Sequence, residues 1–365
     1  MKKLLAFLLV IPLFTTTCYA EELCENAAES LNIYAVEEEL AAGEKEIIGE
    51  LELSGNYDTG GALSRLFKDF LENVGDTLKK ELRSVFAVAA ISVLCAAGMS
   101  VCAEKGMGEY ISMAACVAVA AMLAGSMDGI VSSATSALNR LSDYSKAAMP
   151  AVFSASAACG AVVSSPAKYA AVCLALDVLM SVSQKLVIPL VYCYIAVAIT
   201  GSISPNPILR TAARVVKWLA TALMTGLTIA FSAYIGLTGL ITGSTDAAAV
   251  KTAKTVISSS LPVVGGIISD AASVVLSAAS IIKNSAGVFC LVAVCALCAG
   301  PFAILSVKTF LFKVSAAIAD MIPGGRLSAL LNDIGTAMSM LLGLVGCCGI
   351  MLFISFMAAI KVVAV

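Results

Sequence analysis

Apolar segments of about twenty residues recur along this chain, and they constrain its fold more than any other feature. The first two clear examples are residues 84–103 and 111–131. Of the 365 residues, 60% are apolar and 13% are charged, which leaves too little polar surface for a soluble protein of this length. Because lipid offers no partners to backbone polar groups, a spanning segment must satisfy them internally, as a helix does. The sequence therefore predicts an all-α polytopic membrane protein.

The middle of the chain breaks into shorter apolar pieces, at residues 147–166, 169–184 and 186–204. Proline interrupts two of them, at Pro150 and Pro189, and Lys168 and Lys185 separate the three. Such pieces are typical of broken or re-entrant membrane helices. Longer apolar runs follow at residues 218–243, 286–307 and 338–360. We expect about 6–8 transmembrane helices, and each re-entrant pair changes that number by two.

Residues 1–20 have the organisation of a secretory signal peptide. A basic start with two lysines precedes an apolar core at residues 4–14, and Cys18-Tyr19-Ala20 forms a small-x-small cleavage site. We expect this segment to be cleaved, which leaves the following residues outside the cytoplasm.

The chain then continues through an acidic stretch into an amphipathic helix. Residues 21–60 are rich in glutamate and poor in large apolar groups, so we expect a flexible extracytoplasmic segment. Apolar residues in 61–83 recur every three or four positions, which predicts an amphipathic juxtamembrane helix. They are Leu63, Leu66, Phe67, Phe70, Leu71, Val74, Leu78 and Leu82. This helix either lies on the bilayer or the protein's own spans, or docks another extracytoplasmic protein.

Basic residues indicate the orientation of the remaining segment, a multi-span membrane domain at residues 84–365. One cluster holds Arg210, Arg214 and Lys217, and Lys308 and Lys313 follow a later span. Lysine and arginine bias a loop toward the cytoplasm. Both loops are therefore predicted to lie inside, and the chain is predicted to be a multi-pass cell-membrane protein with its N-terminal segment outside.

A polar stretch at residues 244–285 interrupts the apolar spans. Lipid tolerates charge and irregular backbone only where protein or water shields them, so this stretch is the first place to expect function. The candidate residues are Lys251, Lys254, Pro262, Gly265, Gly266, Asp270, Lys283 and Asn284. Two interpretations remain open. The charges pair across a hydrophilic lining or a subunit contact, or the segment is an interfacial helix whose lysines reach the headgroups.

Asp177 is a further candidate, because it lies inside one of the short middle pieces. A buried carboxylate in lipid is costly unless it is paired, and Lys168 and Lys185 are the expected partners. The alternative is that Asp177 lies in an interfacial piece and is solvated.

The residues present exclude several kinds of catalysis. The chain has no histidine, which removes Ser-His-Asp and Cys-His catalysis and HExxH zinc sites. It also lacks a Gly-x4-Gly-Lys-Ser/Thr loop, so another chain would have to supply any ATPase activity. Cys290, Cys295 and Cys298 match an iron–sulfur spacing, but they lie in an apolar helix where small buried side chains pack. We expect no enzymatic activity, cofactor, metal site or nucleic-acid partner.

The polar stretch resembles the stage III sporulation protein AE family of endospore-forming bacteria. The resemblance rests on Lys251-x-Ala253-Lys254, Pro262-Val-Val-Gly-Gly266, Ser269-Asp270-Ala271 and Ile282-Lys283-Asn284 with Gly287. It implies a complex made by the mother cell, in the membrane around the forespore, that forms a channel or secretion-like apparatus. Its implied partners are membrane lipid and the other stage III sporulation A proteins, including a separate ATPase and extracytoplasmic ring proteins. It carries over no catalytic residues.

Two hypotheses for the function follow. The first is a membrane-embedded core subunit of a sporulation channel complex that links mother cell and forespore and is needed after engulfment. The alternative is an autonomous secondary transporter, with Asp177, Asp270 and nearby lysines as coupling sites. A transporter moves solute alone in liposomes, whereas a core subunit needs its partners. Small residues in the spans allow close packing within one bundle or within a homo-oligomer.

Overall fold

The computed structural model describes residues 28–29, 33–49, 58–101, 105–159, 164–204, 206–241, 265–320 and 325–361, and the regular elements among them are all helical. They are α2 (Ala35–Glu38), α3 (Ala42–Ile48), α4 (Thr59–Val101), α5 (Lys105–Ala158), α6 (Ser164–Val182), the π-helical turn η1 (Ser183–Val187), α7 (Ile188–Ile203), α8 (Pro207–Ile241), α10 (Gly265–Ala319) and α11 (Arg326–Lys361). The all-α prediction is confirmed for this part of the chain. The predicted signal peptide lies outside it.

Among the described residues, five helical stretches are long and apolar enough to cross a membrane, judged by length and composition. They are Thr59–Val101, Tyr169–Ile203, Pro207–Ala233, Lys283–Ala319 and Arg326–Ile360. α5 carries a shorter apolar part, Met107–Leu123. The helices α5 and α10 have 54 and 55 residues. Each is therefore about 80 Å long, more than twice the roughly 30 Å hydrocarbon core of a bilayer.

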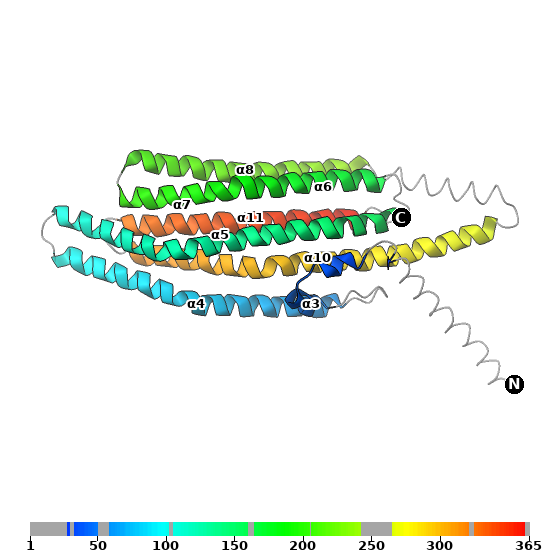
Figure 1. The fold of residues 1–365 in the computed structure, drawn as a ribbon, viewed down its shortest axis with the longest axis horizontal. Helices are drawn as coiled ribbons and strands as arrows, with labels where there is room; N and C mark the ends of the chain where they lie inside the picture. Colours follow the sequence, from blue (N-terminus) through cyan, green and yellow to red (C-terminus); the bar gives the residue numbers. More distant parts are fainter. Residues whose placement is uncertain are drawn as a thin grey trace, which may run out of the picture.

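The long helices lie side by side in an elongated bundle, and the chain alternates between its two ends (Figure 1). α4, the continuous α6–α7 helix and α10 run toward one end, and α5, α8 and α11 return from it. We call this the basic end. The cations near it on α8, α10 and α11 are Arg210, Arg214, Lys217, Lys308, Lys313 and Arg326. The two basic loops that the sequence assigns to one side of the membrane thus lie at one end of the bundle.

The middle of the chain forms fewer and longer helices than the sequence predicts. α5 passes through Pro150 without ending, and α10 continues through Pro301. A proline removes one backbone hydrogen bond, but packing against neighbouring helices holds the helix on both sides. The predictions that Lys168 and Lys185 separate pieces and that Pro189 interrupts one are wrong. Lys168 lies inside α6, and α6, η1 and α7 form one helix through Lys185 and Pro189. The π-helical turn there leaves the Lys185 side chain exposed at the helix surface.

α10 and α11 form the centre of the bundle, and their contact is the most extensive between any two described helices. Small residues make this contact close. A Cβ added at Gly349 would lie 2.6 Å from the Sγ of Cys298, and one added at Gly287 would overlap the side chain of Ile360. Phe289 on α10 is fully buried. Close approach of helix backbones through small residues is the packing that membrane bundles use.

Several buried hydroxyl groups donate to backbone carbonyls. Ser92 donates to the Val88 carbonyl and Ser355 to the Met351 carbonyl, both at 2.8 Å. Ser156 reaches the Ala359 carbonyl on α11 at 3.0 Å. An unsatisfied polar group is costly in lipid, so this internal pairing suits a membrane interior.

Part of the acidic N-terminal segment is folded against the bundle. Ile33 and Ile48 are fully buried, and Glu44 on α3 forms an ion pair with Arg140 on α5. The expectation of a flexible segment therefore does not hold for residues 33–49. Val36 and Leu40 are buried as well, so the large aliphatic side chains of this stretch pack against the bundle.

The amphipathic helix and the first span, expected as separate elements, form the single helix α4. Its apolar face is only partly covered. Leu66 is buried, while Leu63, Phe67 and Leu71 remain exposed. The helix thus packs on the protein's own spans and also keeps a free apolar surface.

We predict that Glu44→Gln loosens the docking of α3. The amide oxygen of a glutamine at this position can still accept from the Ala41 backbone N–H, as Glu44 does at 3.0 Å, so the change isolates the loss of the ion pair. A charged hydrogen bond contributes about 1.5–3 kcal/mol, so trypsin cleavage after Lys45 in the detergent-solubilised chain should accelerate about tenfold. Glu46→Gln, on the exposed side of α3, is the matched control. Equal acceleration by both variants would contradict this role of the pair.

Candidate functional site

The residues predicted from the polar stretch are only partly described by the structure. Lys251, Lys254 and Pro262 lie outside the described residues. Gly265 and Gly266 are the first two residues of α10. Asp270 lies on the same helix, and its side chain is not among those described. The structure therefore places the second half of the stretch on one continuous helix.

Lys283 is the most unusual of these side chains, because it is only 2% exposed, whereas its neighbour Asn284 is exposed. Asp270 precedes Lys283 by thirteen residues on α10, a separation of about 20 Å along a helix. Within one chain these two charges cannot pair with each other. At Gly287, one turn further, an added Cβ would lie 2.4 Å from the Ile360 side chain. The second half of the stretch thus contributes a buried lysine and a helix contact.

Asp177 is exposed and lines a cavity of about 520 Å³ between α5 and α6. Lys146 and Tyr169 line the same cavity. Among the described side chains, Asp177 is in no ion pair, so the predicted pairing with Lys185 does not form. The Lys168 side chain is not among those described. Of the two interpretations, the solvated carboxylate fits the described residues.

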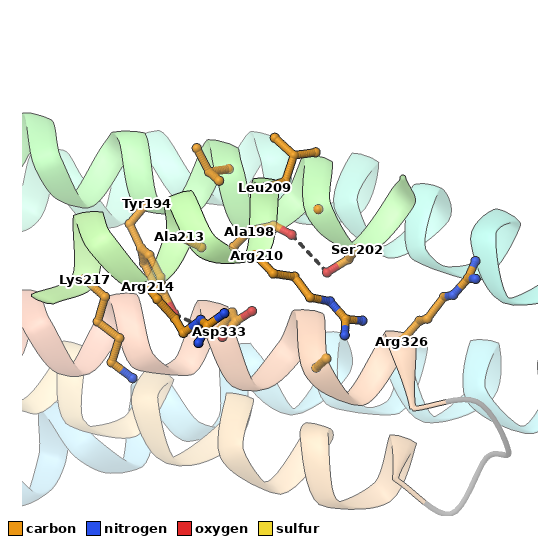
Figure 2. A pocket seen from close by; sticks show the side chains of 13 residues that line it. Tyr194, Ala198, Ser202, Leu209, Arg210, Ala213, Arg214, Lys217, Arg326 and Asp333 are labelled. Carbon is orange, nitrogen blue, oxygen red and sulfur yellow. Dashed lines mark hydrogen bonds between the residues drawn. The ribbon is translucent and has the colours of Figure 1, made fainter. Parts of the chain in front are cut away.

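A second cavity, of about 310 Å³, lies at the basic end between α7, α8 and α11 (Figure 2). Three of its cations come from one face of α8, since Arg210, Arg214 and Lys217 are spaced four and three residues apart. Their side chains extend toward α11 (Figure 2). α11 adds Arg326 and Asp333 to the lining, and α7 adds Tyr194, Ala198 and Ser202. We call this the basic cavity.

Positive charge dominates the basic cavity. Its lining holds four cations and one carboxylate, Asp333, which accepts a hydrogen bond from the Tyr194 hydroxyl at 3.0 Å. Arg326 Nη2 donates to Glu109 Oε1 at 3.2 Å, while its buried Nη1 has no hydrogen-bond partner among the described residues. The three cations of α8 form no ion pair within the described part of the chain.

The sequence alone indicates only part of this cavity. It presents the cluster on α8 as an orientation signal, and the spacing of that cluster along one helix face is the available clue to a site. Tyr194 and Asp333 are 139 residues apart, and only the fold brings them together.

α4 carries a third group of charges, on the outer side of the bundle. Lys68 pairs with Glu72 at 3.9 Å and Lys79 with Asp76 at 3.7 Å, and these side chains are 66–80% exposed. We call these four residues the charged face of α4.

An ion pair fixes the position of the charged face along the long axis of the bundle, which we call its height. Glu81 accepts from Lys308 Nζ on α10 at 2.9 Å, and α4 and α10 run in the same direction (Figure 1). Lys68 precedes Glu81 by thirteen residues on α4, and Cys295 precedes Lys308 by thirteen residues on α10. Lys68 and Cys295 therefore lie at about the same height in the bundle. The charged face therefore runs beside residues of the apolar candidate span Lys283–Ala319.

The described residues contain no group of three Cys, Asp or Glu side chains that could hold a metal ion. Cys290, Cys295 and Cys298, which match the iron–sulfur spacing, lie on α10 and form no disulfide.

Comparison with known proteins identifies the family of this chain. The sequence model of the family described as "Stage III sporulation protein AE (spore_III_AE)" matches residues 44–363. The stage III sporulation protein AE of Bacillus subtilis (strain 168) is 22% identical over 222 residues, which is 61% of this chain and 56% of that relative. The chain thus aligns with little more than half of the relative's length. No solved structure matches. The matched range includes every described helix from α4 to α11, and the chain belongs to the stage III sporulation protein AE family.

Proposed function

We propose that this protein is a membrane-embedded core subunit of a sporulation channel or secretion-like complex linking mother cell and forespore, needed for forespore development after engulfment. Family membership supports the sporulation role, and the five apolar helices of spanning length support the membrane location. The family is not a known family of enzymes. The observation that favours a channel is that the charged face of α4 is exposed beside an apolar span.

The charged face lies at the height of an apolar span, and this is the difficulty that the proposal resolves. Charged side chains at membrane depth face a water-filled cavity or the interior of a bundle, because exposure to lipid is costly. The four residues are instead exposed on the outer side of the bundle. In an assembly with further copies or partner subunits, this face borders water. The exposed Leu63, Phe67 and Leu71 beside it provide apolar contact for the neighbouring subunit.

The orientation follows from the basic end. Lysine and arginine favour the cytoplasmic side, so the basic end lies in the mother-cell cytoplasm, where the separate ATPase of the complex would act. The opposite end faces the space between the membranes, within reach of the extracytoplasmic ring proteins, and α2 and α3 lie in the half of the bundle nearer to it (Figure 1).

An autonomous transporter is the second candidate, favoured by the cavity that Asp177 shares with Lys146. The purified chain reconstituted alone in liposomes distinguishes the two. Solute uptake lost in Asp177→Asn would favour the transporter, and the channel proposal predicts no uptake without partner subunits.

We predict that sporulation depends on the polarity of the α4 face. Deleting the gene in its source organism should give shrunken or transcriptionally silent forespores after engulfment, and the wild-type gene should restore them. Lys68→Leu/Glu72→Leu should restore fewer than about a tenth of the spores, because an apolar patch does not suit a water-lined surface.

The matched control is Lys68→Gln/Glu72→Gln, which removes the same charges, keeps polarity and should restore sporulation. If α4 faces lipid instead, the leucine pair would be tolerated, which contradicts the proposal.

Lys251→Ala/Lys254→Ala and Asp270→Asn, in the polar stretch, should restore sporulation poorly if this stretch forms a subunit contact. Normal spores in the deletion strain would overturn the sporulation role.

We also predict the sidedness of two helix ends. Alkaline phosphatase is active only outside the cytoplasm, so a fusion after Cys159 should be active and a fusion after Ser204 inactive. One helix, α6–α7, separates these positions. Activity in both fusions, or in neither, would contradict a single crossing between them.

A further inference from the structure

We propose that the basic cavity binds a phosphate group, carried by an anionic phospholipid headgroup or by a soluble phosphate compound. This inference does not depend on the role in sporulation. It rests on Arg210, Arg214 and Lys217 along one face of α8 and on the cavity that they line with Tyr194 and Asp333 (Figure 2).

The charges of the cavity call for an anion. Cations gathered along one helix face attract an anion between them, and the lining has one carboxylate for four cations. That carboxylate, Asp333, is engaged by the Tyr194 hydroxyl. A phosphate oxygen placed among the cations would accept from the guanidinium groups, which match phosphate geometry with two parallel donors.

Arg326 on α11 lines the cavity and pairs with Glu109 on α5. Its side chain is 15% exposed, and one guanidinium nitrogen, Nη2, is used by Glu109. The other, Nη1, is buried without a hydrogen-bond partner in the described residues. The Arg326 side chain extends away from Arg210 and Arg214 (Figure 2), so it adds positive charge at the edge of the cavity and is not a donor placed among the cations of α8.

The position of the cavity favours a lipid source. Trp218 directly follows Lys217, is 68% exposed and begins the apolar part of α8. Exposed tryptophan is enriched at the height of the headgroups, and basic cavities between membrane helices bind anionic headgroups. A cavity of about 310 Å³ has room for a phosphate and part of a headgroup, with the acyl chains along the exposed apolar surface of α8.

The test measures binding of dioleoylphosphatidylglycerol to the purified full-length chain in detergent by native mass spectrometry, with dioleoylphosphatidylcholine for comparison. Arg214→Gln should weaken phosphatidylglycerol binding about tenfold, because it removes one charge-assisted hydrogen bond to phosphate. Asp333→Asn should strengthen it about threefold, because it removes the competing carboxylate and keeps an acceptor for Tyr194. Lys185→Gln, an exposed lysine outside the cavity, is the matched control and should change nothing.

A second arm measures thermal stabilisation of the same chains by inorganic phosphate. Phosphatidylglycerol binding could be the same in the cavity variants and the wild type, while phosphate stabilises the wild type and not Arg214→Gln. This result would support a phosphate site whose ligand is a soluble compound. If neither probe responds to Arg214→Gln or Asp333→Asn, the proposal is overturned. Should Arg214→Gln fail to fold, the gain expected from Asp333→Asn still decides, because misfolding does not tighten binding.

Discussion

The close pairing of α10 with α11 is the interaction on which the rest of the bundle depends. Glycines at the contact let the two backbones approach, and α4 and α5 pack around α10. Through the pair of Lys308 with Glu81, α10 also fixes the register of α4. Because that register is fixed, the charged face of α4 is held at the height of the most apolar part of α10. The location of charge in this protein is thus a consequence of helix packing in its centre.

A membrane constrains where those charges can lie. Several buried hydroxyl groups donate to backbone carbonyls. The charges of α4 pair only with one another at the exposed surface, and the three cations of α8 form no ion pair within the described residues. The two proposals answer this constraint differently. Water in an assembly accommodates the α4 face, and a bound anion accommodates the basic cavity. Since the two groups of residues do not overlap, either proposal can fail without affecting the other.

Sequence patterns predict the class of fold well and its boundaries poorly. Long apolar runs are sufficient to predict an all-helical membrane protein. The residues from Lys251 to Gly287 are sufficient to suggest the family. The breaks predicted at Pro150 and Lys185 are wrong, because a local rule does not include the neighbouring helices that support a helix across such a residue. The basic cavity escapes prediction for a related reason. Its lining joins α7, α8 and α11, and no local pattern connects Tyr194 with Asp333. Lys251, Lys254 and Pro262 lie outside the described residues and stay predictions.

The most direct test of the central claim, that α4 presents its charges to water at membrane depth, compares two thiols at one height. In membranes from sporulating cells, Lys68→Cys would be treated with a charged, membrane-impermeant methanethiosulfonate, in a background where the native cysteines other than Cys295 are replaced by alanine. Cys295 is exposed on α10 at the height of Lys68. A thiol in lipid does not ionise and stays unreactive. The account predicts that Lys68→Cys reacts while Cys295 does not. Equal reactivity of the two thiols, or none at Lys68→Cys, would contradict it.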